Sequence, residues 1–214
     1  MKYGSCEHAR LVVGVLEGLY PEAICSLEYS GEPWKLLIMG RLSAQCTDAR
    51  VNIVCRELFS RFPTLADVAD APLSELEEII RPCGLYRTKS AQVKEACRML
   101  RDEYGGKVPD TMDALLRLPG VGRKTANLLL GDIYKRPGSV VCDTHCIRIC
   151  NLLGLASGKE PAKVEQQLRA ILPPDESSDF CHRIVLHGRA VCAARKPACD
   201  RCCLAPYCRS FSGS

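Results

Sequence analysis

The chain has 214 residues, of which 47% are hydrophobic and 25% are charged, as is typical of a globular protein with a sizeable core. Its net charge of only +4 excludes an overall strongly basic chain, so a nucleic-acid partner would require the positive charge to lie on one face. The apolar windows, such as residues 11–20, are too short to span a membrane, and the chain does not begin like a signal peptide, which predicts a cytoplasmic protein.

Apolar residues recur with helical spacing along nearly the whole chain, and no convincing run alternates with the period of a strand. The first clear pattern places apolar residues at i, i+3, i+4 and i+7, namely Val51, Val54, Cys55 and Leu58. Thr47 or Asp48 precedes it as a natural N-cap. We therefore expect an all-α fold of about ten helices.

Two short helices are expected next, because Thr64 with Asp67 and Ser74 with Glu77 have the spacing of a capping box. The same periodicity indicates further helical segments at residues 88–104, 110–134 in two pieces around a turn, 144 onward, 163–172 and 179–191. No long linker interrupts these segments, so we expect any two domains to be packed closely.

Among the 15 cysteines, four candidate ligands lie near the C-terminal end, Cys192, Cys199, Cys202 and Cys208, with six, two and five residues between them. Four thiolates at this spacing can hold either zinc or an iron–sulfur cubane. Zinc sites usually contain two close pairs and this segment has one, which favours a [4Fe-4S] cluster over zinc. The segment is too polar and short to bury a core, so we expect the metal to order it.

Three cations lie between these cysteines, Arg195, Lys196 and Arg201, and Arg209 follows the last of them. On an ordered loop they would form a surface for DNA phosphates, although solubility or compensation of an anionic cluster would explain them as well. Cys203 directly follows Cys202 and is interpreted as a bystander.

The sequence Pro-Gly-Val-Gly at 119–122 separates two helical segments and is followed by Arg123 and Lys124. Gly120 and Gly122 allow backbone N–H groups to point outward at a helix start, where an anion binds readily. The pattern suggests a helix-hairpin-helix that grips DNA phosphates, or else a tight helix connection. A positive charge in the first turn of a helix is mildly destabilising, so the presence of Lys124 there suggests a chemical role for its amine.

Five segments together resemble the endonuclease III family of DNA glycosylases and abasic-site lyases: LSAQCTD at 42–48, GLYR at 84–87, LPGVGRKTAN at 118–127, VVCDTHCIR at 140–148 and HGRAVCAARKPACDRC at 187–202. The resemblance covers nearly the whole chain. It implies a helical domain at 23–135 with the hairpin at about 112–130, a cluster domain formed by 1–22 and 136–214, and a groove between them.

The resemblance implies that Lys124 is the nucleophile that displaces a flipped base and forms a Schiff base with the sugar. A helix N-terminus and partial burial would both favour the neutral, reactive amine. Asp143 matches the catalytic aspartate, whose charge would stabilise the developing positive charge on the sugar. Without the family, Asp143 is simply a helix N-cap, and the two roles are compatible.

By resemblance, Gln45 and Leu85 fill the gap left by the flipped nucleotide, and His145 contacts a phosphate or the lesion. On sequence alone they are an ordinary helix-end residue, an exposed loop leucine and a structural histidine. His182 and His187 are assigned to packing.

The chain also departs from the family, with Cys142, Cys146 and Cys150 where aliphatic residues are expected and Leu152 where arginine is frequent. The cysteines share one helix face, so core packing is favoured over a second metal site.

We therefore expect a monomeric enzyme that acts on oxidised pyrimidines or abasic sites in duplex DNA, with no membrane partner. The alternatives are an adenine-specific mismatch glycosylase, which lacks the lysine, and a non-catalytic DNA-binding or redox-sensing iron–sulfur protein.

Overall fold

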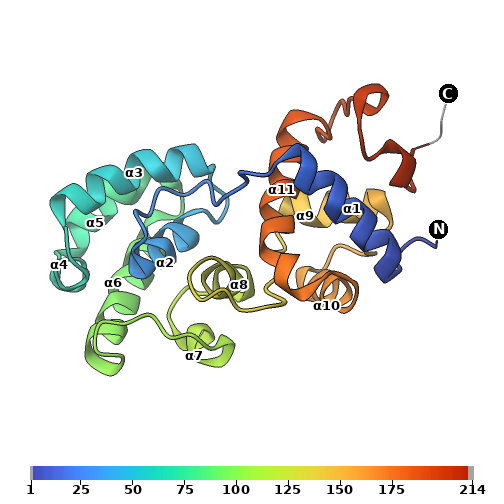
Figure 1. Cartoon of the computed structure of the whole chain (residues 1–214). Helices are drawn as coiled ribbons and strands as arrows, with labels where there is room; N and C mark the ends of the chain where they lie inside the picture. Colours follow the sequence, from blue (N-terminus) through green and yellow to red (C-terminus); the bar gives the residue numbers. More distant parts are fainter. Residues whose placement is uncertain (1, 212–214) are drawn as a thin grey trace. The chain divides into compact units, whose positions relative to one another are not determined.

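The computed structural model of the chain describes residues 2–211 and confirms the all-α prediction (Figure 1). Within these residues there are eleven α-helices, four short 3-10 helices and no strand. The α-helices are α1 (Cys6–Leu19), α2 (Pro33–Leu42), α3 (Asp48–Arg61), α4 (Leu65–Asp70), α5 (Leu73–Ile80), α6 (Tyr86–Glu103), α7 (Met112–Arg117), α8 (Arg123–Asp132), α9 (Thr144–Leu153), α10 (Pro161–Ile171) and α11 (Ser177–Ala190). The 3-10 helices are η1 (Arg81–Cys83), η2 (Pro174–Glu176), η3 (Cys199–Arg201) and η4 (Ala205–Tyr207).

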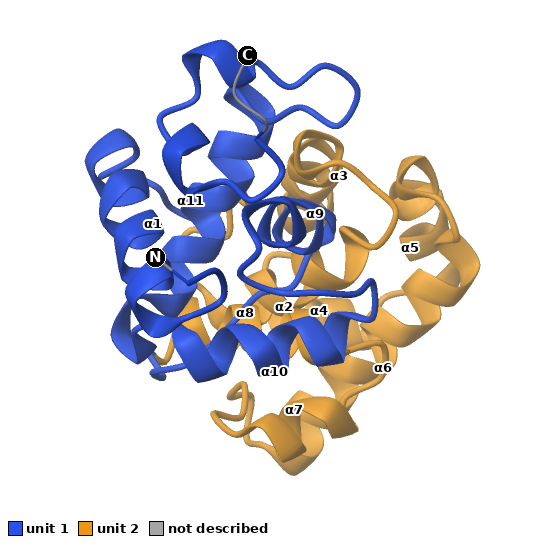
Figure 2. Ribbon diagram, turned by 90° about the vertical axis from the view of Figure 1, so that its right-hand side faces the viewer, with its two compact units in different colours: residues 1–24, 135–214 blue, residues 25–134 orange. Residues whose placement is uncertain are grey.

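The chain divides into two compact units, which Figure 2 shows in different colours. The first unit comprises Met1–Ile24 and Lys135–Ser214, and the second comprises Cys25–Tyr134. The assignment of one unit to a metal cluster and of the other to DNA binding stays a prediction at this point.

In the second unit, α6 packs against α4 and α5, while α2 packs against α6 and α8. The approach of α2 to α8 is close at Gly40. A Cβ atom at that position would lie 2.8 Å from the methyl group of Thr125, which is shorter than a normal contact. The glycine therefore lets the helix that precedes Gln45 pack directly on the helix that carries Lys124.

In the first unit, α11 packs against α1 and α9, and α1 also contacts η4. His8 on α1 is fully buried and connects these distant parts of the sequence. Its Nδ1 atom accepts a hydrogen bond from the Gly4 N–H at 3.2 Å, so Nε2 carries the proton and donates to the carbonyl of Tyr207 at 2.9 Å. The C-terminal loop is thus attached to the first helix of the chain.

Two expected helix starts are confirmed and one is wrong. Thr47 caps α3 through a hydrogen bond from the Arg50 N–H, and Thr64 with Asp67 forms a capping box on α4. The box expected at Ser74 is absent, because the N-cap of α5 is Pro72, two residues before the expected cap, and the helix begins at Leu73.

The reason lies in Pro72, which directly precedes α5 with φ −56°. Proline has no N–H group to leave unsatisfied and its φ is already close to the helical value. The helix therefore starts directly after it, and Ser74 falls inside the first turn.

No helix within residues 2–211 is both long and apolar enough to cross a membrane.

Candidate functional site

The turn after α7 has the geometry of a helix-hairpin-helix. Thr111 caps α7 by accepting a hydrogen bond from the Ala114 N–H at 3.4 Å. The turn is closed by a bond from the Val121 N–H to the carbonyl of Leu118 at 3.1 Å, and α8 follows at once. The prediction of two helices joined by this turn is confirmed.

Gly120 is the position in the turn that most strongly favours glycine. Its φ is +76°, in the left-handed region. A Cβ atom there would also lie 2.6 Å from Cδ of Arg41 and 2.8 Å from Oε1 of Gln92. These two side chains are bonded to each other, with Nε of Arg41 donating to Gln92 at 2.7 Å. The hairpin is therefore seated on a fixed polar pair from α2 and α6.

Gly122 serves a different purpose, as the N-cap of α8. Its φ is −104°, which any residue can adopt, and a Cβ atom there would meet no atom within 4 Å. Because glycine has no side chain, no side-chain bond caps the helix. The start of α8 is thus left accessible for an outside acceptor such as a phosphate oxygen.

Lys124 lies in the first turn of α8 and its side chain is exposed, as are Gly122 and Arg123. The expectation of partial burial for Lys124 is therefore wrong. The neighbouring Thr125 and Ala126 are the first buried residues of α8, because they face α2 and the core of the second unit. The amine is held on a rigid helix and points away from that core.

Asp143 is the N-cap of α9, as the sequence predicts. Its Oδ1 atom accepts a hydrogen bond of 2.7 Å from the N–H of Cys146, with extended backbone at φ −90° and ψ −178°. The residue is half-buried. The hydrogen bond to Oδ1 fixes the orientation of the carboxylate. The cap uses only this oxygen and does not require Oδ2.

His145 lies two residues further on, and its ring packs against α11. A Cβ atom at Gly188 would lie 2.5 Å from Nδ1 of His145, so only glycine permits this contact. Within residues 2–211 the buried Nδ1 atom has no hydrogen-bond partner. The ring orientation is thus set by packing rather than by a polar contact.

Gln45 and Leu85 lie on two turns of the second unit and are both exposed. Both adopt the left-handed conformation, with φ of 57° at Gln45 and 48° at Leu85. This conformation is unusual for residues other than glycine and marks positions held by their surroundings.

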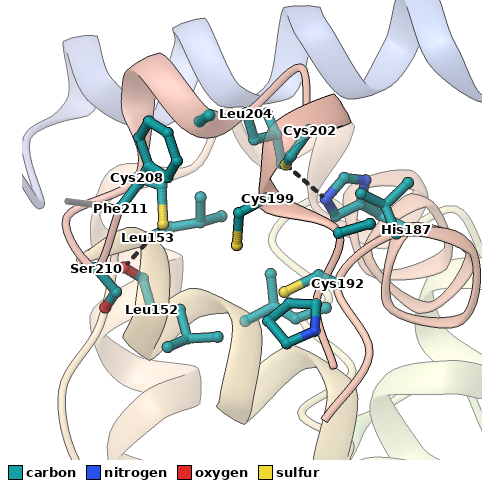
Figure 3. A pocket seen from close by; sticks show the side chains of 15 residues that line it. Leu152, Leu153, His187, Cys192, Cys199, Cys202, Leu204, Cys208, Ser210 and Phe211 are labelled. Atoms are coloured by element: carbon teal, nitrogen blue, oxygen red, sulfur yellow. Dashed lines mark hydrogen bonds between the residues drawn. The ribbon is translucent and has the colours of Figure 1, made fainter. Parts of the chain in front are cut away.

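The structure brings the four predicted metal ligands to one cavity of about 130 Å³ in the first unit (Figure 3). Cys192 follows α11, Cys199 begins η3, Cys202 follows η3, and Cys208 follows η4. Cys192 and Cys199 point into the same space, while Cys202 faces His187 and Cys208 faces the Leu152 carbonyl at 3.4 Å. As placed, no three His, Cys, Asp or Glu side chains within residues 2–211 are arranged to hold a single metal ion.

Two polar contacts to these sulfur atoms were missed by sequence reasoning. His187, assigned to packing, has Nε2 at 3.5 Å from Sγ of Cys202, and Arg148 donates to Sγ of Cys192 at 3.6 Å. Burial lowers the pKa of His187, with the charge of Arg148 adding to the effect. The Tyr20 hydroxyl lies 3.3 Å from Nδ1 of His187 and can donate to it.

With Nδ1 accepting from Tyr20, the neutral ring carries its proton on Nε2, which faces Cys202. Burial raises the pKa of the Cys202 thiol, while the Nε2–H group of His187 and the guanidinium of Arg148 are directed as donors at the sulfur atoms of Cys202 and Cys192. Only the tertiary fold could reveal this, because Arg148, His187 and the cysteines have no fixed spacing in sequence.

The cations that lie between and just after the four cysteines are of two kinds. Arg201 and Arg209 are bonded to the backbone, donating to the carbonyls of Ala190 at 3.3 Å and Asn151 at 3.2 Å. Arg195 and Lys196 are exposed, and in residues 2–211 neither has a hydrogen-bond or ion-pair partner. Cys203 is also exposed and does not line the cavity.

The three unusual cysteines near Asp143 are core residues, as predicted. Cys142, Cys146 and Cys150 are buried, and Cys181 of α11 lies beside them. Hydrogen bonds with the other three thiols, and then burial, hold the pKa of Cys146 well above its usual value. The four buried side chains therefore pack as small apolar groups.

The family model for the HhH-GPD superfamily of base excision DNA repair proteins matches residues 38–174. An endonuclease III from Synechocystis sp. is 42% identical over 208 residues, which cover 97% of this chain and 94% of that protein. The chain belongs to the endonuclease III family. The endonuclease III of Bacillus subtilis is 38% identical and covers 89% of this chain and 87% of its own length.

A solved structure of an endonuclease III trapped as a covalent intermediate with DNA matches with a TM-score of 0.90 and 39% identity. It covers 97% of both chains. The family and the fold expected from the sequence motifs are thereby confirmed.

Proposed function

We propose that Lys124 is the nucleophile with which this chain removes oxidised pyrimidines from duplex DNA and cleaves the strand at the abasic site. As a member of the endonuclease III family, the chain is a DNA glycosylase and abasic-site lyase of base excision repair. The observation that carries the assignment is the exposed amine in the first turn of α8, two residues after the open N-cap at Gly122. A relative with 39% identity has been trapped covalently on DNA, which requires such a nucleophile.

The proposed reaction begins when a damaged base is flipped out of the duplex, which exposes C1′ of its sugar. The neutral Lys124 amine forms a bond to C1′ as the bond from C1′ to the base breaks and the base leaves with its electron pair. Ring opening gives a Schiff base, which withdraws electrons from the sugar. Loss of a C2′ proton then expels the 3′ phosphate, and water releases the enzyme from the sugar.

Asp143 is proposed to stabilise the positive charge that develops on the sugar as the base leaves. Capping through Oδ1 fixes the carboxylate without requiring both oxygens. A fixed negative charge lowers the barrier more than a mobile one, because it needs no reorganisation during the reaction.

DNA contacts are proposed for six exposed residues and for Gly120 and His145, which are half-buried. Gly120 and Gly122 would present backbone N–H groups to phosphates, with Arg123, Arg195 and Lys196 supplying positive charge. Gln45 and Leu85 would fill the space left by the flipped nucleotide, and His145 would lie near the lesion or a phosphate.

Cys192, Cys199, Cys202 and Cys208 are proposed to hold a [4Fe-4S] cluster. The residues present fit such a group, since all four thiols line one cavity and His187 and Arg148 direct N–H groups at two of the sulfur atoms. The cluster would order the loop that carries Arg195 and Lys196. The base-release chemistry itself is assigned to Lys124 and Asp143.

The test is incubation of the purified protein with a duplex that contains one abasic site. Strand scission is expected, and its absence would reject the lyase assignment in favour of an adenine-specific glycosylase or a non-catalytic DNA-binding protein. A panel of duplexes with single defined lesions tests the preference for oxidised pyrimidines. Sedimentation at the assay concentration tests the proposed monomer.

A further inference from the structure

Lys89 on α6 is a lysine with a completely buried side chain, exposed by 0%. Its Nζ atom donates three hydrogen bonds, to the carbonyls of Leu42 at 2.9 Å, Ala44 at 2.8 Å and Cys83 at 2.8 Å. An ammonium has three donors, so all of them are used. Within residues 2–211 no carboxylate lies within ion-pair distance of it, and burial lowers its pKa.

Burying an ammonium without a paired carboxylate is costly even when all its protons are bonded, so this arrangement calls for a compensating benefit. The three carbonyls come from two separate turns. Leu42 and Ala44 lie at the end of α2, and Cys83 ends η1. One side chain therefore connects two loops that are about forty residues apart in the sequence.

Each of these loops carries a residue with an unfavourable backbone. Gln45 directly follows Ala44, and Leu85 follows Cys83 and Gly84. In residues 2–211 positive φ occurs at only four residues other than glycine, Ser30, Gln45, Leu85 and Lys135. Two of the four thus lie beside the carbonyls that Lys89 binds. A left-handed backbone at such residues persists only when its surroundings enforce it.

Lys89 also holds Leu85 through its backbone, because the Lys89 N–H donates to the Leu85 carbonyl at 3.0 Å. Leu85 is itself 60% exposed, so little packing of its own side chain fixes its position. The restraint on Leu85 therefore comes from the backbone contacts on either side of it.

We infer that Lys89 is a positioning residue that holds the turns of Gln45 and Leu85 at a fixed separation, ready to enter a DNA duplex together. The inference rests on the proposed function, in which these two side chains fill the space of the flipped nucleotide. Turns that are ordered before binding lose less conformational freedom when the lesion is engaged. Binding to undamaged DNA does not require their insertion and so does not depend on Lys89.

The first test uses amide hydrogen exchange without DNA, comparing wild type with Lys89→Met, which keeps the chain length but removes the donors. In the variant, the exchange rate of the backbone amides should rise both in residues 44–46 and in residues 84–86. The matched control is Leu100→Ala, which removes a fully buried side chain from the same helix about 16 Å further along it. An unchanged rate in either turn, or an equal rise in the control, would overturn the inference.

The second test measures Kd for a lesion duplex and for an undamaged duplex of the same sequence. Lys89→Met should weaken lesion binding by about tenfold while undamaged binding stays within about twofold, since misplaced groups lose productive contacts. Leu100→Ala should leave the ratio of the two Kd values unchanged. If the ratio is unchanged in Lys89→Met, the positioning role is wrong.

If Lys89→Met does not fold, Lys89→Gln replaces it, because glutamine keeps two donors on a shorter side chain. The same two readouts and the same control apply. Failure of wild type to cleave an abasic duplex would reject the proposed function, whereas the exchange experiment still decides whether Lys89 holds the two turns.

Discussion

The carboxylate of Asp143 accepts a hydrogen bond of 2.7 Å from the N–H of Cys146, which makes it the N-cap of α9. The same carboxylate is proposed to stabilise positive charge on the sugar. The structural role needs a hydrogen-bond acceptor, while the chemical role needs a negative charge. The two roles can therefore be separated by a substitution that keeps the acceptor and removes the charge.

Asp143→Asn should change the free energy of unfolding by less than about 1 kcal/mol, because asparagine is as good an N-cap as aspartate. Release of a damaged base should slow by roughly 10²-fold or more, since a preorganised charge is lost. On a duplex that already has an abasic site the deficit should be smaller. Thermal denaturation and single-turnover assays on both duplexes measure these effects.

Asp143→Ala is the control, because alanine removes both the charge and the acceptor. It should slow base release and also cost about 1 kcal/mol of stability. If Asp143→Asn releases bases at the wild-type rate, the carboxylate is only a cap.

The two glycines of the hairpin should respond differently to alanine. Gly120→Ala adds a Cβ atom 2.6 Å from Arg41 at a φ of +76°, so strain and overpacking together should cost roughly 2–5 kcal/mol. Gly122→Ala meets open space at an ordinary φ and should change stability by less than about 1 kcal/mol. Thermal denaturation compares the two.

DNA affinity supplies the second readout for this pair. Gly122→Ala should weaken binding to duplex DNA, because its methyl group would obstruct the approach of a phosphate to the start of α8. Wild-type affinity in Gly122→Ala would show that DNA does not approach the hairpin at this residue.

Cys199→Ser should remove or destabilise the cluster, because serine replaces one of the four thiols that line the cavity. Cys203→Ser is the matched control, since Cys203 is exposed and lies outside the cavity lining. Visible absorption and iron and sulfide analysis of anaerobically purified protein measure cluster content. One zinc and no iron in the wild type would instead establish the zinc alternative.

The helices and the hairpin were predictable because their signals are local. Thr47 and Thr64 each cap a helix through an N–H group only three residues later in the sequence. Gly120 and Gly122 mark a turn between two segments with helical periodicity. The wrong capping box at Ser74 has a local cause too, since the preceding Pro72 determines where α5 begins.

The contacts that sequence reasoning missed are long-range. His187 reaches Cys202, and Lys89 joins carbonyls on two distant turns, through side chains whose partners no periodicity identifies. The exposure of Lys124 was missed for the same reason, because the packing of α8 on α2 determines which side of the helix is buried.

Lys196→Ala should reduce the salt dependence of DNA binding. Lys196 is exposed between Cys192 and Cys199 and is proposed to neutralise one phosphate. Its loss should flatten the plot of log affinity against log salt concentration by roughly one unit. Lys159→Ala is the control, since Lys159 is also exposed in the first unit but lies outside residues 192–208, which contain the four cysteines. An unchanged slope in Lys196→Ala would assign that side chain to solubility.

Lys124→Gln should abolish covalent trapping on DNA while the fold is preserved. Borohydride reduces a Schiff base, so wild type should become covalently attached to a duplex that carries a damaged base, and the variant should not. Lys124 is exposed and glutamine has a similar helix propensity, so the free energy of unfolding should change by less than about 0.5 kcal/mol. Gel analysis of borohydride-treated reactions and thermal denaturation provide the two measurements.

The matched control for trapping is Lys107→Gln, which removes another exposed lysine of the second unit, in the loop after α6. It should be trapped as efficiently as wild type, because it leaves the start of α8 unchanged. A trapped complex with Lys124→Gln on damaged DNA would mean that another amine attacks C1′. Nucleophilic attack would then not explain why a lysine occupies the first turn of α8, where a cation is mildly unfavourable.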